Sequence, residues 1–297
     1  MLHARRLYHF LAIANAGSIT GAAEQLSVTQ PALTRSLKQL EELLEVELVE
    51  RTPSGIILTP AGKILARRAK LMNLEYQHAM AEVTEWTQGV RGHLNIAAGP
   101  AWILQILPSV MAEYYRQYPD IRVSLSAGGF DSQLERLLTG EVDAVCGALD
   151  FPAHAELVKE PLTRLRHTFV GRREHPLVSK EIIEPEDLAQ YSWVILSDDH
   201  ISSGRIGAYF VANGLEPPHV VMETNAMGAL AVVRRTDHLT TFASVARPTL
   251  EALGLSIIDH KGTLWDFEAG ITYLKSSTPT PALNGFRSVL RSQIVDS

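Results

Sequence analysis

The stretch from Ser18 to Glu42 constrains the fold of this chain more than any other part of it. Its second half spaces leucines as one face of a helix, and these are Leu33, Leu37, Leu40 and Leu44. Thr29 precedes that helix as a candidate N-cap, and Pro31 falls in its first turn, where a missing N–H costs nothing. Residues 20–26 form a shorter helix rich in small side chains. Two helices joined by a tight turn at residues 27–28 predict a helix-turn-helix.

The face opposite the leucines carries polar side chains, and these are Gln30, Thr34, Arg35 and Lys38. A glutamine side chain pairs bidentately with adenine, an arginine with guanine, and a proline ring can touch a thymine methyl group. We therefore expect the N-terminal end of this helix to enter the major groove of DNA.

The charge is divided unevenly along the chain. The net charge is −6, but residues 1–92 carry ten Lys and Arg against nine Asp and Glu. Residues 51–70 contain only basic charges, and these are Arg51, Lys63, Arg67, Arg68 and Lys70. A basic run by itself usually marks a solvated surface, but this one follows a helix-turn-helix directly. The pattern favours a protein that touches phosphates with its N-terminal end only.

The segment 50–59 has a Pro-Ser-Gly turn between β-prone flanks. We interpret it as a two-stranded wing whose tip carries Arg51, Thr52 and Ser54 toward the DNA backbone. The alternative is a plain connecting loop.

Thr59 and Pro60 then open a long helix, as N-cap and first helical residue. Its apolar residues alternate by four and three, as in a coiled coil, and these are Leu65, Ala69, Met72, Tyr76, Ala79, Val83 and Trp86. A seam about 40 Å long at 1.5 Å per residue exceeds what one small winged domain can cover, so we expect it to pair with a second chain. The alternative is packing on its own domain. Gly89–Gly92 is the expected hinge and domain boundary.

From His93 onward, strands and helices alternate, which is typical of an α/β domain with a largely parallel sheet. One expected strand is a short one around residues 167–170. Two such lobes in tandem, with the chain crossing between them, predict a cleft that binds a small molecule.

Several function classes lack support in the sequence. The single cysteine, Cys146, lies in an apolar strand, so we expect a core residue and no disulfide or cysteine metal site. Asp198-Asp199-His200 lacks a second ligand cluster, so we expect no metal site. Nucleotide-binding and hydrolase motifs are absent, which predicts a protein that is not an enzyme and needs no cofactor. With neither a membrane span nor a secretion signal, we expect a cytoplasmic protein.

The order of several short motifs resembles one family in particular. Residues 17–20, 22–23, 26, 29–32 and 40–41, followed by Thr59-Pro60-Ala61-Gly62 and a long helix, match LysR-type transcriptional regulators in register. Leu107-Pro108, Tyr118-Pro119 and residues 140–144 match more loosely. The resemblance covers the whole chain.

The resemblance implies an α/β chain built from an N-terminal winged helix-turn-helix, a long linker helix and a two-lobed effector domain of the type 2 periplasmic-binding-protein class. The expected domains are 1–58 for DNA binding, 59–89 for linking and dimerisation, and 90–297 for effector binding. Lobe I would span about 90–162 and 268–297, and lobe II about 163–267.

The resemblance also implies partners. The chain would form homodimers or homotetramers on a promoter palindrome, and a contact with RNA polymerase is compatible with it. Gln30, Pro31, Thr34 and Arg35 would face base edges or adjacent phosphates, and Lys38 and the wing residues would face the backbone. Thr29 is expected among the DNA-binding residues as well.

The effector would be a small molecule of unknown identity held between the lobes. The implied contacts are Pro100, Ala101, Trp102, Gly129, Phe130, Ser197, Asp198, Ser202, Ser203, Thr224 and Asn225. Many members have a hydroxyl side chain where this chain has Ala101 and Phe130. Trp102 and Phe130 would instead favour an effector with an apolar or ring portion, unless both are core residues. Arg234 and Arg235, where the family usually has a glycine-rich turn, receive no role.

The expected function is therefore sequence-specific transcriptional regulation controlled by an effector. The alternative is a cytoplasmic solute-binding or metabolic protein that uses its N-terminal helices only for assembly. The polar, basic face of residues 29–38 favours the regulator, because an assembly helix would be apolar there.

Overall fold

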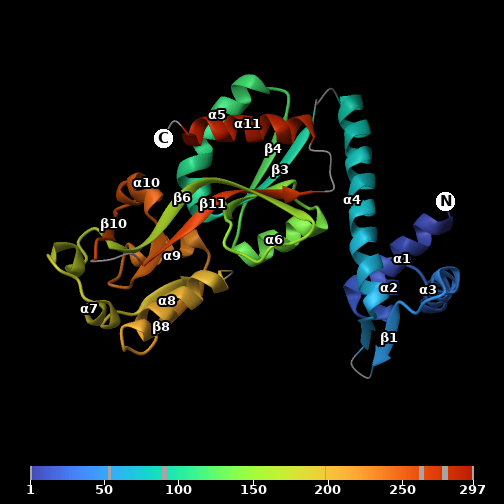
Figure 1. The fold of residues 1–297 in the computed structure, drawn as a ribbon, viewed down its shortest axis with the longest axis horizontal. Coiled ribbons are helices and arrows are strands. Elements are labelled where there is room, and N and C mark those ends of the chain that lie inside the picture. The colour runs from blue at the N-terminus through green and yellow to red at the C-terminus, as the bar shows by residue number, and fades with distance from the viewer. Residues whose placement is uncertain are drawn as a thin grey trace. The chain divides into compact units, whose positions relative to one another are not determined.

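The structure is a computed structural model that describes residues 2–52, 55–88, 92–197, 199–260, 264–275 and 280–295. The chain divides into two compact units, Met1–Gln88 and Gly89–Ser297, whose elements are labelled in Figure 1. Each unit is described by itself. None of the described helices is long and apolar enough to cross a lipid bilayer.

The N-terminal unit is a winged helix-turn-helix followed by a long helix. Its elements are α1 (Leu2–Ala16), α2 (Ile19–Gln25), α3 (Gln30–Leu44), β1 (Val49–Thr52), β2 (Gly55–Leu58) and α4 (Pro60–Gln88). Strands β1 and β2 pair antiparallel, so the predicted wing is confirmed and the plain loop is excluded. The core of the unit contains Phe10, Ile13, Leu33, Leu37, Leu40 and Leu48.

Local hydrogen bonds explain where the short helices begin and end. The Ser18 side chain caps α2 by accepting from the Gly21 N–H at 3.1 Å. Thr29 occupies the N-cap position of α3, but its side chain makes no capping hydrogen bond. The leucine stripe is one turn shorter than predicted, since Leu44 is 42% exposed. The chain leaves the helix directly after it, where Glu45 takes a left-handed conformation with φ 54°.

The wing is held against the helices by backbone contacts. The Ile56 N–H donates to the Gly17 carbonyl at 2.8 Å. The Thr59 hydroxyl donates to the Glu47 carbonyl at 2.8 Å and accepts from the Gly62 N–H at 3.0 Å. Thr59 therefore caps α4, as predicted, and also ties α4 to the segment before the wing.

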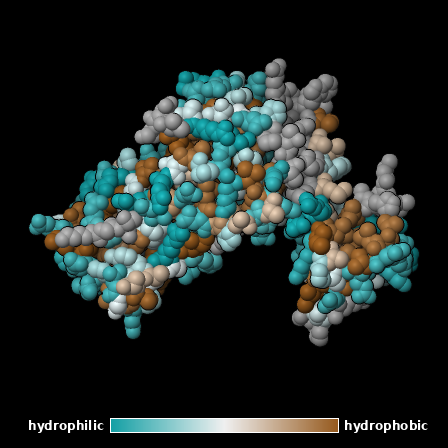
Figure 2. Space-filling view, in the orientation of Figure 1, coloured by the Kyte–Doolittle hydropathy of each residue, from teal (hydrophilic) through white to brown (hydrophobic). Residues whose placement is uncertain are grey.

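Helix α4 leaves apolar side chains uncovered within its unit. Hydrophobic residues also gather around α1 on the face of this unit that Figure 2 shows. Four members of the expected pairing face are Met72, Tyr76, Ala79 and Val83, and all are exposed. Ala69, one turn earlier, is buried. The seam therefore packs on its own unit only near the start of α4.

The second unit contains a seven-stranded sheet of order β10-β6-β11-β5-β3-β4, with β9 also paired to β6. Its strands are β3 (His93–Ala98), β4 (Arg122–Ala127), β5 (Ala144–Ala148), β6 (Leu157–Arg172), β9 (Thr240–Ala243), β10 (Leu255–Ile258) and β11 (Trp265–Leu274). A separate pair, β7 (Trp193–Leu196) and β8 (Val220–Thr224), is parallel.

The helices of this unit follow the strands in alternation. They are a π-helical turn η1 (Trp102–Ile106), α5 (Leu107–Gln117), α6 (Phe130–Thr139), η2 (Pro176–Ser179), α7 (Pro185–Ala189), α8 (His200–Ala212), α9 (Ala226–Val233), η3 (Ser244–Ala246), α10 (Arg247–Ala252) and α11 (Pro281–Val295). Helices α5 and α11 lie side by side (Figure 1). Arg235, two residues after the end of α9, donates to the Ala231 carbonyl at 2.9 Å, and Arg234 lies beside Gly254.

One strand and the type of sheet differ from the prediction. The short strand expected around residues 167–170 is β6, which spans 157–172, and it pairs antiparallel with β11 along the whole of β11. The sheet is therefore mixed, because only the pairs of β3 with β4 and β5 are parallel, and the prediction of a largely parallel sheet was wrong. The boundaries assigned to the lobes at 162/163 and 267/268 fall inside these two continuous strands. Proline and charged residues in 159–166 interrupt the apolar alternation that would have revealed β6.

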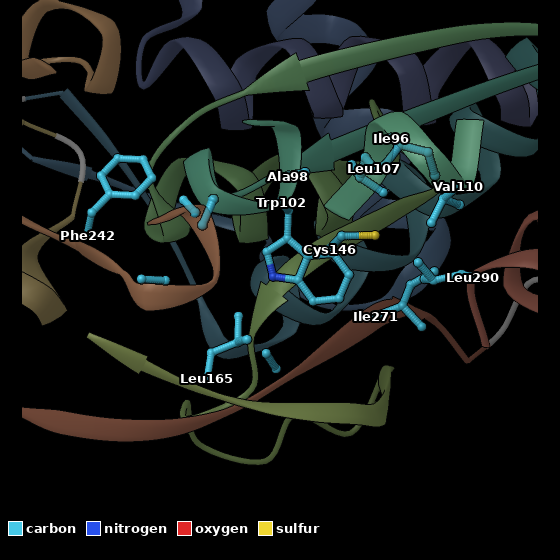
Figure 3. Close-up of a cluster of buried hydrophobic side chains, with 14 of the residues drawn as sticks. Ile96, Ala98, Trp102, Leu107, Val110, Cys146, Leu165, Phe242, Ile271 and Leu290 are labelled. Carbon is cyan, nitrogen blue, oxygen red and sulfur yellow. The ribbon is translucent and has the colours of Figure 1, made fainter. Parts of the chain in front are cut away.

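The larger of two hydrophobic cores that the described residues of this unit form lies where β3, β5 and β11 meet η1, α5 and α11 (Figure 3), and the smaller one includes Phe169, Trp193 and Phe210. Trp102 is 2% exposed, and Cys146 is fully buried close to it in the larger core. Burial raises the pKa of the Cys146 thiol, so the thiolate is disfavoured. Cys146 is a core residue, as predicted.

Candidate functional site

The exposed face of α3 carries the polar side chains that the sequence singled out. Thr29, Gln30, Pro31, Arg35 and Lys38 are exposed, and Thr34 is half-buried. Lys38 lies 3.8 Å from Glu42, but both side chains are largely in water, so this ion pair is weak. The polar side chains thus remain available to a partner.

A buried polar contact fixes α3 on α1. The His9 ring Nδ1 and the Ser36 hydroxyl are 2.8 Å apart on the side of α3 that faces the core. Burial, and secondarily the charge of Arg5, lowers the pKa of His9, which favours the neutral ring. The orientation of the exposed face therefore depends on a contact behind it.

The wing residues are described only in part. Arg51 and Thr52 lie in β1, and the Thr52 hydroxyl donates to the Gly55 carbonyl at 3.1 Å. Ser54 lies outside the described residues, as do Gly89–Arg91 of the expected hinge.

The second unit contains a cleft of about 370 Å³ with mostly apolar walls. Residues at the carboxyl ends of β3, β4, β5, β7 and β8 line it. In open sheets, the carboxyl ends of parallel strands are where ligands bind. Further lining comes from β6, β9 and β11, so one cavity collects residues from both halves of the unit.

Most of the predicted effector contacts line this cleft. They are Pro100, Ala101, Trp102, Gly129, Ser197, Ser202, Thr224 and Asn225. Ser203 is not among the lining residues, because its hydroxyl is turned back to the Asp199 carbonyl at 3.0 Å. Phe130 begins α6, and its side chain is not described, while Asp198 lies outside the described residues.

The structure adds lining residues that sequence reasoning missed, and these include Gln133, Asp150, His167, Asp199, Arg205, Trp265 and Phe267. The buried Gln133 amide donates to the carbonyls of Ala98 at 2.8 Å and Gly128 at 2.6 Å, which holds two loops of the cleft together. Single polar residues in strands and helices belong to no sequence motif, so most of these lining residues could not be predicted. The one available signal was the polar side chain of Gln133 on an otherwise apolar helix face.

The charged side chains in the cleft form ion pairs or hydrogen bonds with other groups of the same chain. Arg205 donates to the Asp150 carboxylate at 2.9 Å. The Asp199 carboxylate accepts from the Ser202 N–H at the start of α8, at 3.0 Å. Asn225 does the same for the Gly228 N–H at the start of α9, at 2.9 Å.

His167 stands among these groups as a neutral ring. Burial lowers its pKa to about 4; the charge of Asp199 opposes this shift, and the charge of Arg205 adds to it. In the described part of the chain, no group of three His, Cys, Asp or Glu residues is arranged to hold a metal ion.

Both units match models of the same protein family. Residues 4–63 match the bacterial regulatory helix-turn-helix protein model of the lysR family, and residues 87–294 match the LysR substrate binding domain model. The chain belongs to the LysR family of transcriptional regulators. It therefore combines a regulatory helix-turn-helix with a domain that binds an effector.

Individual relatives of this LysR-family chain are moderately similar. The regulator CysL of Bacillus subtilis (strain 168) is 28% identical over 84% of this chain and 83% of its own length. The uncharacterised regulator YbhD of Escherichia coli (strain K12) is 31% identical over 62% of this chain and 58% of its own length. Full-length CbnR, solved in complex with its target DNA, has a TM-score of 0.61 at 23% identity, covering 98% of this chain and 99% of CbnR. CbnR shares the fold.

Proposed function

We propose that this chain is a sequence-specific, effector-controlled transcriptional regulator whose DNA contacts come from α3 and whose effector occupies the cleft of the second unit. The observation that carries the proposal is the exposed polar face of α3, on which Gln30 and Arg35 are free of the core. Their donors and acceptors suit base edges of adenine and guanine. The cleft of the second unit provides the site for the effector.

The chain acts in the cytoplasm as a binding protein, without catalysis and without a cofactor. It works as a homodimer or higher oligomer that pairs through α4, because Met72, Tyr76 and Val83 present apolar area that its own unit leaves uncovered. Two α3 helices about 34 Å apart would read successive major-groove half-sites.

The test is fluorescence anisotropy of the full chain with fragments of its own upstream region, at several salt concentrations. We expect a preferred fragment and a steep loss of affinity with salt, because phosphate contacts release counterions. A fragment with the same composition in shuffled order is the control. Equal affinity for both fragments at every salt concentration would contradict the proposal.

A further inference from the structure

One wall of the cleft is flat and aromatic. His167 in β6 and Trp265 in β11 are direct partners in the strand register, and their rings stack at 4.5 Å with an interplanar angle of 17°. Phe267, two residues further along β11, lies 5.3 Å from the same imidazole. Arg205 lies over the Trp265 ring at 5.7 Å. Such a surface favours a flat ring of a ligand, which can stack on it.

Two buried polar atoms at this cleft have no hydrogen-bond partner among the described residues. They are the indole Nε1 of Trp102 and the imidazole Nδ1 of His167. Figure 3 shows the indole nitrogen on the side of the ring toward Leu165 and Phe242, which both line the cleft, and away from Cys146. A buried polar atom without a partner lowers stability, because it has lost its hydrogen bonds to water and gained none in the folded chain. A ligand that supplies the missing partner would recover part of this loss.

The cleft offers little to an anion. The start of α8 already holds the carboxylate of Asp199, and Asn225 caps the start of α9. Pro100, at the helix that leads into η1, has no N–H to offer. Arg205 is neutralised by Asp150, so the described charged side chains of the lining sum to one negative charge. The starts of α8 and α9 are thus already occupied by side chains of the protein. Among the described helices at the cleft, only the start of α6, where Gly129 provides no side-chain cap, keeps the usual attraction of a helix N-terminus for anions.

We propose that the cleft binds an uncharged effector with a flat ring and a polar substituent, which accepts from the Trp102 indole N–H and pairs with His167, and that it disfavours organic anions. The inference rests on the proposed function, because it names the chemistry of the same effector site. A primary carboxamide on an aromatic ring is the simplest group with these properties, since it offers both an acceptor and donors.

The test uses pairs of probes that match in shape and differ in charge. These are benzamide with benzoate, 2-naphthamide with 2-naphthoate, and indole-3-carboxamide with indole-3-carboxylate. Titration calorimetry on the full chain at pH 7.5 should show at least one carboxamide binding about tenfold or more tightly than its carboxylate, because an unpaired anion would meet Asp199. Carboxylates that bind as well as or better than the carboxamides, or no binding by any carboxamide, would overturn the proposal.

Variants then assign the contacts. Trp102→Phe keeps the ring and removes the N–H, so carboxamide affinity should fall about 5- to 30-fold, as for one buried hydrogen bond. Trp193→Phe is the matched control, because Trp193 is buried but does not line the cleft. Asp199→Asn can still cap α8 and should narrow the preference for carboxamide over carboxylate. Equal carboxamide affinity in Trp102→Phe and the control, or an unchanged preference in Asp199→Asn, would overturn the assigned contacts.

DNA binding by the same preparations separates this proposal from the proposed function. A chain that prefers carboxamides but binds no DNA fragment selectively would support the cleft chemistry and contradict the regulator. Selective DNA binding with a preference for carboxylates would do the reverse.

Discussion

Arg35 and Lys38 both extend from the exposed face of α3, one turn apart, but they suit different parts of DNA. The guanidinium forms a planar fork that matches guanine, whereas the ammonium is a compact charge that matches a phosphate. Base contacts carry sequence information, and phosphate contacts fix the position of the protein. Substitutions at the two residues should therefore be distinguishable by specificity.

Replacing Arg35 with alanine should reduce affinity for the preferred DNA fragment by about 1–3 kcal/mol and relax its selectivity. Lys38→Ala is the matched control, and it should weaken binding to preferred and shuffled fragments alike and lower the salt dependence by about one unit of slope. Anisotropy titrations on both fragments measure these effects. An equal loss on both fragments for Arg35→Ala would show that this residue contacts only the backbone.

A second residue-scale prediction concerns His167, whose folded-state pKa is about 4 against an ordinary value of 6.5. As pH falls, the His167 ring takes up a proton in the unfolded chain at a higher pH than in the folded chain. The free energy of unfolding therefore has its full value above the unfolded pKa and decreases as pH drops toward 4. Between pH 7.5 and 5, His167 should account for a loss of about 1–2 kcal/mol in unfolding free energy. Its contribution acts in the same direction as those of His9, His175 and His260, whose pKa values burial also lowers.

Urea unfolding followed by tryptophan fluorescence measures this loss, because three of the four tryptophans lie in the second unit. His167→Phe preserves the stacking on Trp265 and removes the titrating group, so its stability should vary less with pH than that of the unchanged chain. Identical pH dependence of the two chains would contradict the assignment.

At the scale of elements, close backbone approaches decide how α4 begins. Gly62, in the first turn of α4, lies against the chain just before the wing. A Cβ at this position would lie 2.0 Å from the Leu48 carbonyl oxygen. Because this oxygen belongs to the backbone, it cannot move away as the end of a flexible side chain could. The Thr59 cap sits at the same junction. The wing and α4 therefore need glycine here for packing, and not for an unusual backbone conformation.

Gly62→Ala should accordingly lower the stability of the N-terminal unit by about 2 kcal/mol or more, despite the better helix propensity of alanine. Gly207→Ala in α8 makes the same change where nothing lies within 4 Å, and it should be neutral or stabilising by about 0.5–1 kcal/mol. Scanning calorimetry of the full chain compares the two. A stable Gly62→Ala variant would mean that α4 can move away from Leu48 freely.

At the scale of the whole molecule, the exposed seam of α4 governs assembly. Met72 and Tyr76 are 61% and 63% exposed within their own unit. Burying side chains of this size contributes about 1.5–3 kcal/mol each. Two copies of the seam, each several turns long, would bring the DNA-reading helices of two chains onto one duplex.

The double variant Met72→Glu with Tyr76→Glu should dissociate the oligomer and weaken DNA binding at least tenfold, since four like charges would face one another in the pair. Ile64→Glu is the control, because Ile64 is 58% exposed on α4 but lies about 100° around the helix from the seam. Sedimentation velocity measures the assembly state. An unchanged sedimentation coefficient in the double variant would place the interface elsewhere.

The sequence by itself determined the elements whose conformation depends on interactions between residues close together in the chain. Residues 18–42, the wing and the Thr59-Pro60 start of α4 carry their own spacing, caps and turn chemistry, and the structure has these elements. The family resemblance predicted cleft residues at the ends of strands, such as Pro100 and Thr224, and both line the cleft.

Only the tertiary structure decided the chemistry of the cleft. His167 and Trp265 meet because β6 and β11 pair in one particular register across a long sequence separation, and no local pattern specifies that register. Arg205 in α8 and Asp150, which follows β5, are 55 residues apart in the chain and meet only in the folded unit. The length of β6, along which β11 pairs, also came only from the structure, because proline and charged residues in 159–166 interrupt the hydrophobic pattern of this strand.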